Sequence, residues 1–184
     1  MDRNKAIFLD RDGTINVEKN YLHRIEDFEF LPGAVEAMSI MTEMGYKLVV
    51  VTNQSGIARG YYTEADYLRL NAWMMEKLER HGIVISGTYY CPHLPDAVVE
   101  EYRFDCNCRK PKLGLYDRAI IEQGLDIHQC IAIGDKDRDI AVARKYNIPG
   151  YRIYAESEMH EANIWNIKGG LLQVARIIGD GVSS

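Results

Sequence analysis

Two acidic residues two positions apart, Asp10 and Asp12, follow a short apolar run and precede the pair Gly13-Thr14. One carboxylate of such a pair can act as a nucleophile and the other as a proton donor. The glycine lets the backbone turn tightly, so that a ligand can approach it. An ordinary strand followed by an Asp-Gly turn has the same residues. The pair alone therefore leaves both interpretations open.

Three further polar segments could complete a phosphate site. Val51–Gly56 offers hydroxyl, amide and backbone donors for phosphate oxygens, and Cys108–Lys112 is basic. A cation beside an aspartate nucleophile neutralises both the carboxylate and the attacked phosphoryl group. Gly134–Asp139 is acidic, and its Asp135 suits Mg²⁺, which takes one or two carboxylates together with phosphate and water. The plainer interpretations are a polar loop, a solvated basic run and a helix with an acidic first turn.

The elements that must position these segments can be read from the apolar pattern. Short apolar runs predict strands at residues 6–9, 47–51, 84–90, 130–133 and 151–154. Helical spacing between start and stop signals predicts helices at about 33–44, 63–80, 113–123, 137–146 and 165–178. Continuous apolar strands that alternate with helices are typical of a parallel sheet covered on both faces. The sequence therefore predicts a doubly wound α/β fold.

Three of the polar residues fall at equivalent places in this predicted sheet. Asp10, Thr52 and Asp135 each follow a predicted strand at its carboxyl end. Ligands of doubly wound sheets bind outside the carboxyl ends of the strands. We therefore expect the three side chains to converge on one edge of the sheet.

In this order the four segments resemble the motifs of the haloacid dehalogenase-like phosphohydrolases, over residues 6 to about 153. The resemblance implies a Rossmannoid fold and a magnesium-dependent phosphatase. In it Asp10 becomes an aspartyl phosphate, Asp12 is the acid–base, and Thr52 and Lys110 hold phosphoryl oxygens. It also implies that Mg²⁺ is bound by Asp10, the Asp12 backbone carbonyl and Asp135. The residues expected to bind the rest of the substrate are Asn53, Gln54, Ser55, Arg59, Arg109 and Lys136.

A second metal site of a different kind is suggested by Cys91, His93, Cys106 and Cys108. Tetrahedral Zn²⁺ takes such ligands in closed structural sites. The spacing is tighter than in zinc fingers, and the alternative is three unrelated thiols and a surface histidine. We expect a structural zinc loop over residues 91–108. Cys130 lies inside an apolar run and is expected to be an inert core residue.

This loop resembles that of a branch of the family with small caps, which contains histidinol-phosphate phosphatases and D-glycero-D-manno-heptose 1,7-bisphosphate phosphatases. The runs Val51–Gly60, Tyr89–His93 and Cys106–Pro111 are more similar to the heptose enzymes. They imply release of the 7-phosphate, giving heptose 1-phosphate for nucleotide-heptose and surface glycan synthesis. Histidinol-phosphate hydrolysis is the alternative, and a zinc-stabilised binding module without catalysis is a third. No long insertion leaves room for a large cap domain.

The composition sets the remaining expectations. The chain has 184 residues, 22 basic and 27 acidic, and a net charge of −5. It lacks the basic stripe of a nucleic-acid binder, and a few local cations suffice for a small phosphorylated sugar. No apolar run approaches the roughly 20 residues of a membrane span, and the N-terminus lacks a signal-peptide pattern. We expect one cytoplasmic, monomeric domain over residues 1–184, without a membrane partner, ending in a packing helix and a frayed tail within 155–184.

Overall fold

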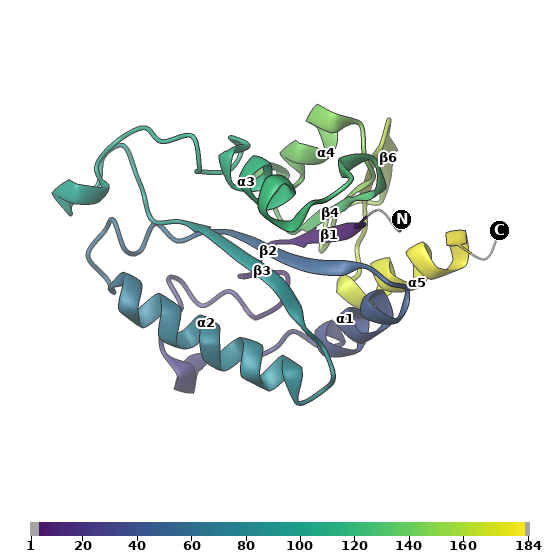
Figure 1. Ribbon diagram of the computed structural model, residues 1–184, viewed down its shortest axis with the longest axis horizontal. Coiled ribbons are helices and arrows are strands. Elements are labelled where there is room, and N and C mark those ends of the chain that lie inside the picture. The colour runs from purple at the N-terminus through teal and green to yellow at the C-terminus, as the bar shows by residue number, and fades with distance from the viewer. Residues whose placement is uncertain (1–3, 183–184) are drawn as a thin grey trace.

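One seven-stranded sheet runs through the computed structural model, which describes residues 4–182 (Figure 1). The strand order is β3-β2-β1-β4-β5-β7-β6, and every pair is parallel except β6 and β7. The predicted doubly wound fold is confirmed. The strands are β1 (Ala6–Leu9), β2 (Lys47–Asn53), β3 (Ile85–Cys91), β4 (Ile131–Gly134), β5 (Gly150–Arg152), β6 (Met159–Glu161) and β7 (Ile164–Asn166).

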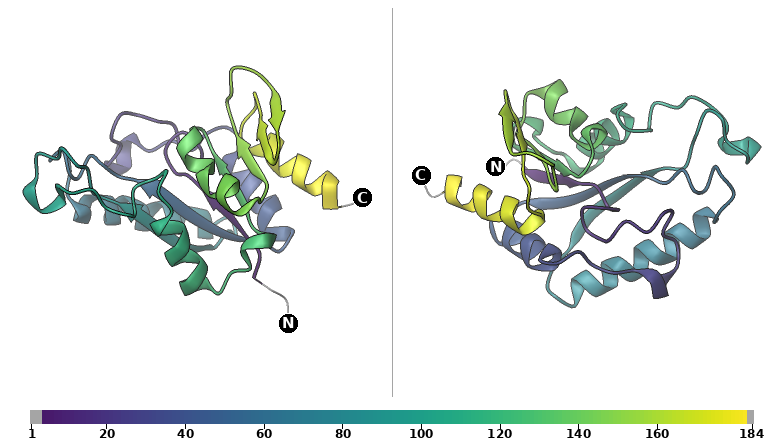
Figure 2. Two further views of the ribbon diagram at one scale, coloured as in Figure 1. Left: turned by 90° about the horizontal axis from the view of Figure 1, so that it is seen from above. Right: turned by 180° about the vertical axis from the view of Figure 1, so that it is seen from behind.

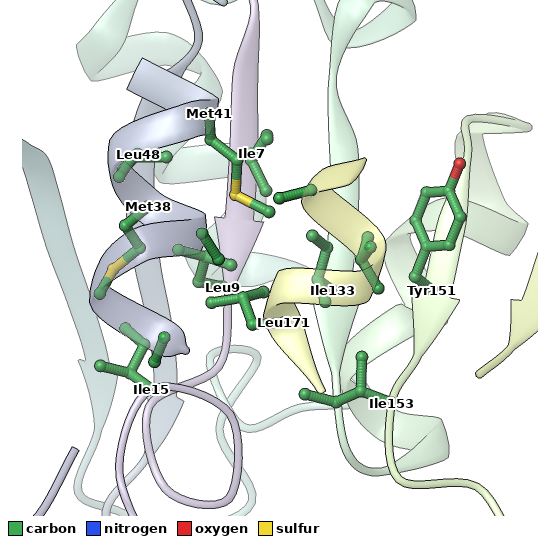
Figure 3. Packing of buried hydrophobic residues seen from close by; sticks show 14 of the residues in the cluster. Ile7, Leu9, Ile15, Met38, Met41, Leu48, Ile133, Tyr151, Ile153 and Leu171 are labelled. Carbon is green, nitrogen blue, oxygen red and sulfur yellow. The ribbon is translucent and has the colours of Figure 1, made fainter. Parts of the chain in front are cut away.

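Helices cover both faces of the sheet and enclose two apolar cores. On one face lie α1 (Ala34–Glu43), α2 (Glu64–Glu79) and α5 (Leu171–Val182), and on the other α3 (Gly114–Gln123) and α4 (Ala141–Tyr146) (Figure 1). Figure 3 shows the first core, where Met38, Met41 and Leu171 pack on the apolar side chains of β1 and β4. Short 3-10 helices span Ile25–Asp27, Glu100–Tyr102, Ile127–Gln129 and Asp137–Ile140.

The central strand β1 is buried along its whole length, as its uninterrupted apolar run predicts. Leu9 pairs with Val50 of β2 and with Ile133 of β4, which puts the ends of these three strands at one edge. A capping box begins α2. The Thr63 hydroxyl accepts a hydrogen bond from the Asp66 backbone N–H, and the Asp66 carboxylate accepts one from the Thr63 backbone N–H.

The prediction of a helix over residues 165–178 is wrong in its first half. Ile164–Asn166 forms β7, which pairs with β5 on one side and with β6 on the other. Trp165 stacks on Tyr151 of β5 with ring centroids 5.2 Å apart, a contact between residues that are distant in the sequence. The helix α5 begins only after the break at Gly169-Gly170. In Figure 2 the β6–β7 hairpin stands beside α5; the end of the predicted frayed tail, residues 183–184, lies outside the described residues.

Two long connections leave the carboxyl edge of the sheet. Residues 10–33 join β1 to α1, and residues 92–113 join β3 to α3 and reach out from the end opposite the chain termini (Figures 1 and 2). Their only helices are single 3-10 turns, so neither connection forms a large cap. Within residues 4–182, no helix has the length and apolar character of a membrane span.

Candidate active site and metal cluster

Lys110 and Asp10 form a buried ion pair at the carboxyl edge of the sheet. The Lys110 ammonium lies 2.7 Å from Asp10 Oδ1 and 2.7 Å from Asp139 Oδ1, and it donates to the backbone carbonyl of Val51 at 2.6 Å. Its side chain is 1% exposed. The three partners come from the ends of β1 and β2 and from the turn after β4, so the fold brings residues 100 positions apart into contact.

Burial raises the pKa of the Asp10 carboxyl to about 7. The positive charge of Lys110 lowers this pKa, whereas the negative charges of Asp139 and Asp12 raise it further. Burial disfavours the charged form of Lys110 as well, but Asp10, Tyr116 and Asp139 outweigh it and raise its pKa above the usual value. Lys110 is therefore a permanent cation at the site. It can neutralise the carboxylate and a phosphoryl group beside it.

The acidic residues of this centre fit a hard cation. Oxygens of Asp10, Asp135 and Asp139 lie within 4.8 Å of one another, and Asp135 Oδ1 is buried without a hydrogen-bond partner in residues 4–182. Asp139 is already engaged, since Oδ1 faces Lys110 and Oδ2 accepts from the Lys136 backbone N–H at 2.9 Å. Asp10 and Asp135 are thus the side chains best placed to bind Mg²⁺, which prefers oxygen ligands.

Gly13 makes this arrangement possible. Its φ of +83° lies in the left-handed region that favours glycine. A Cβ at this position would lie 2.6 Å from Asp135 Oδ2. The glycine of the first motif therefore lets the backbone pack directly on the carboxylate that follows β4.

Asp12 is held by donors on several sides. Arg11, whose side chain is 1% exposed, donates from Nη2 to both carboxylate oxygens at 3.0 and 2.9 Å. Asn16 Nδ2 donates to Oδ1 at 2.9 Å, and Gln54 Nε2 donates to Oδ2 at 3.0 Å. These bonds fix the position of the carboxylate. The roles of Arg11 and Asn16 at this carboxylate could not be predicted from the sequence pattern alone.

The carboxyl end of β2 and the two residues after it contain four of the predicted site residues, and they differ in what they contact. Asn53 exchanges two hydrogen bonds with the backbone of Lys110, at 3.1 and 3.0 Å, so its amide positions the lysine. Thr52 is buried and accepts from Gln54 Nε2 at 2.9 Å. Ser55 lines a cleft that opens beside Asp12.

This cleft has a volume of about 320 Å³, and three arginines line it together with Asp12 and Glu18. Arg59 and Arg109, both predicted from the sequence, line it together with Arg138, which was not predicted. Arg59 Nε is buried there without a hydrogen-bond partner in the described chain. Arg138 stands between two aspartates in the sequence, and this segment was therefore interpreted as acidic. Lys136, by contrast, lies outside this cleft and pairs with Asp135 at 2.8 Å.

The four side chains predicted to bind zinc lie together in the 92–113 connection and the end of β3. Cys108 Sγ is 3.0 Å from Cys91 Sγ, 3.2 Å from Cys106 Sγ and 3.2 Å from His93 Nδ1. The sulfur atoms are too far apart for a disulfide, whose S–S bond is about 2.05 Å. One nitrogen and three sulfur donors form a set that Zn²⁺ binds tetrahedrally. Cys130 lies apart from this set and is buried, as expected.

The sulfur cluster is connected to the acidic centre by the backbone. Cys108 is followed directly by Arg109 of the cleft and by Lys110. The Cys91 carbonyl accepts from the Gln54 backbone N–H at 2.8 Å. The cluster therefore holds both the cationic side of the site and the loop after β2.

Comparisons with known proteins agree with this geometry. A family model described as haloacid dehalogenase-like hydrolase matches residues 5–147. The D-glycero-beta-D-manno-heptose-1,7-bisphosphate 7-phosphatase of Photorhabdus laumondii is 49% identical over 138 residues, which are 75% of this chain and 73% of the relative. The D-glycero-alpha-D-manno-heptose-1,7-bisphosphate 7-phosphatase of that organism is 43% identical over 145 residues, 79% of each chain.

A solved structure extends the similarity to the whole fold. The D,D-heptose 1,7-bisphosphate phosphatase from B. bronchiseptica, complexed with magnesium and phosphate, has a TM-score of 0.80 and 27% sequence identity. The match covers 97% of this chain and 99% of that chain. It includes the part after residue 147, where the family model ends.

Proposed function

The chain belongs to the haloacid dehalogenase-like hydrolases, and from this premise we propose that it releases the 7-phosphate of D-glycero-D-manno-heptose 1,7-bisphosphate. The products are inorganic phosphate and heptose 1-phosphate, a precursor for nucleotide-heptose and surface glycan synthesis. The observation that carries this proposal is the cleft beside Asp12, which three arginines line. The names of the relatives point to the same reaction.

The arginines distinguish this substrate from histidinol phosphate. A bisphosphate brings a second dianion that needs cations away from the reacting group, and guanidinium groups match phosphate geometry. Arg59, Arg109 and Arg138 provide them. Histidinol phosphate has no second phosphate, so it would leave these guanidinium groups without an anionic partner. We propose the β anomer, since the relative of 49% identity is named for β and that of 43% for α.

The family resemblance implies the chemistry of the two carboxylates, and their place at the carboxyl edge of the sheet supports it. The Asp10 carboxylate attacks phosphorus, the bond from phosphorus to the sugar oxygen breaks, and that oxygen takes a proton from Asp12. A water molecule then attacks phosphorus and gives a proton to Asp12, and the bond to Asp10 breaks to release phosphate. Lys110, 2.7 Å from Asp10, neutralises charge on the transferring group throughout. Thr52 contributes a hydroxyl donor.

Magnesium is the cofactor that the acidic centre fits. Asp10 and Asp135 would hold it, with the Asp12 backbone carbonyl that the family resemblance implies. When bound, it supplies positive charge that offsets the clustered carboxylates and the phosphate oxygens.

We also propose that Cys91, His93, Cys106 and Cys108 bind one structural zinc ion. Four protein ligands leave no open position for catalysis. The ion would fix the loop that carries Arg109 and Lys110. Because thiols that bind zinc must stay reduced, we place the enzyme in the cytoplasm.

A direct comparison of two substrates tests the proposed function. We expect kcat/KM for heptose 1,7-bisphosphate to exceed that for histidinol phosphate by at least about 100-fold, since a charge-assisted contact is worth about 1.5–3 kcal/mol and more than one arginine is involved. Phosphate release measured on both compounds, with Mg²⁺ present, gives the ratio. Equal rates, or a preference for histidinol phosphate, would refute the assignment.

A further inference from the structure

Gln54 lies at the centre of the site but offers little surface to a ligand. Its side chain is buried, with 2% of the residue exposed. Both ends of its amide are bonded within the protein. Nε2 donates to Thr52 Oγ1 at 2.9 Å and to Asp12 Oδ2 at 3.0 Å, while Oε1 accepts from the Tyr62 hydroxyl at 2.6 Å. These contacts suit a residue that acts through its neighbours.

The direction of the amide is set by its neighbours' chemistry. The Asp12 carboxylate only accepts hydrogen bonds when ionised, and the Arg11 guanidinium, 3.5 Å from Oε1, only donates them. A flipped amide would place its oxygen against the carboxylate and its NH₂ against the guanidinium. Gln54 therefore presents N–H to Asp12 and Thr52. The Tyr62 hydroxyl must in turn be the donor to Oε1.

The direction of the Gln54 amide determines which acceptors the Thr52 hydroxyl proton can reach. A hydroxyl has a single donor, and Gln54 occupies an acceptor position of Oγ1. The Thr52 proton has no acceptor among the residues that the structure describes, although the side chain is buried. It is therefore available to an oxygen of a bound phosphoryl group.

Resting on the proposed function, we propose that Gln54 is a positioning residue that turns the Thr52 hydroxyl toward the transferring phosphoryl group, with Tyr62 locking its amide. Without the hydrogen bond from Gln54, the Thr52 hydroxyl can rotate. It then donates to the phosphoryl oxygen for only part of the time. Preorganised donors of this kind act on the transition state more than on substrate binding. The expected signature is a loss in kcat at nearly constant KM.

The Tyr62 ring is well suited to this second role. It stacks on His23 with ring centroids 5.0 Å apart and is buried. A Cβ at Gly56 would overlap the ring, so the glycine allows the loop to close on it. Burial also raises the pKa of the Tyr62 hydroxyl above its usual value, which keeps the donor protonated.

The test uses steady-state kinetics of the full chain with 4-nitrophenyl phosphate and Mg²⁺. For Gln54→Leu we expect kcat to fall about 10- to 100-fold, a part of the roughly 100- to 1,000-fold loss typical of deleting a transition-state donor. For Tyr62→Phe we expect a two- to tenfold loss, about one neutral hydrogen bond. KM should stay within about twofold in both. Tyr67→Phe is the matched control, because its buried hydroxyl lies in the same apolar cluster and has no hydrogen-bond partner among residues 4–182.

A double-mutant cycle separates this role from simple packing. In a Thr52→Val background, Gln54→Leu should cost clearly less than it does in the wild-type background, because only its bond to Asp12 is left to lose. An equal loss in the two backgrounds, or unchanged kcat in Gln54→Leu, overturns the inference. The inference is also overturned if Tyr62→Phe lowers kcat no more than Tyr67→Phe does. Wild-type protein that releases no phosphate from the aryl phosphate or the heptose bisphosphate would instead refute the proposed function itself.

Discussion

Replacing Arg109 by alanine should separate recognition of the second phosphate from catalysis. Arg109 lines the cleft and is half-buried, and the one hydrogen bond of its side chain within the described residues is a long contact of 3.5 Å to the His93 carbonyl. Truncation therefore removes little that stabilises the fold. Loss of one charge-assisted contact to phosphate costs about 1.5–3 kcal/mol. That corresponds to roughly a 10- to 150-fold fall in kcat/KM for the bisphosphate.

The assay compares heptose 1,7-bisphosphate with heptose 7-phosphate, which has the reacting phosphate but lacks the second. Arg109→Ala should lose less than about threefold on the monophosphate, since Lys110 and not Arg109 faces Asp10. Arg109→Lys serves as the conservative control and should recover only part of the loss, because lysine lacks the planar fork. Equal losses on the two substrates would show that Arg109 serves the transferring phosphate or the fold, and would refute the division of roles.

Three further predictions concern the metals and the nucleophile. Asp10→Asn should abolish turnover while the protein stays folded, as far-ultraviolet circular dichroism would show; a tenth of wild-type kcat would exclude Asp10 as the nucleophile. Gly13→Ala should cost about 1–2 kcal/mol in unfolding free energy through its positive φ, and it should raise the Mg²⁺ concentration for half-maximal activity, because the new Cβ would displace Asp135. Elemental analysis should find one zinc ion per chain. If protein that has never been exposed to a chelator contains no zinc, the zinc site is refuted. Cys108→Ser should lower the zinc content and the unfolding temperature together.

Burial explains why most of the fold could be predicted from the sequence. Strands such as Ala6–Leu9 are covered on both faces, so they are continuous apolar runs. The hairpin of β6 and β7 could not be predicted in this way. Both strands have three residues, and all three residues of β6 are exposed, so there was no apolar run to detect. Trp165 was instead predicted to begin the last helix.

Strand ends explain why part of the site could also be predicted. Asp10, Thr52 and Asp135 converge because parallel strands end at one edge. Side-chain direction in the loops depends on tertiary contacts that local sequence does not contain. Asn53 and Gln54 were expected to bind substrate and do line the cleft. Their amides also bond to the Lys110 backbone and to Asp12 and Thr52, which the sequence did not predict.

The most direct test of the proposed reaction is ³¹P nuclear magnetic resonance of heptose 1,7-bisphosphate during turnover with Mg²⁺. The proposal predicts that the 7-phosphate signal disappears as inorganic phosphate grows in equal amount, while the 1-phosphate signal persists. Asp10→Asn protein should leave both signals unchanged. Loss of the 1-phosphate signal, or no hydrolysis by the wild-type protein, would contradict the proposed reaction.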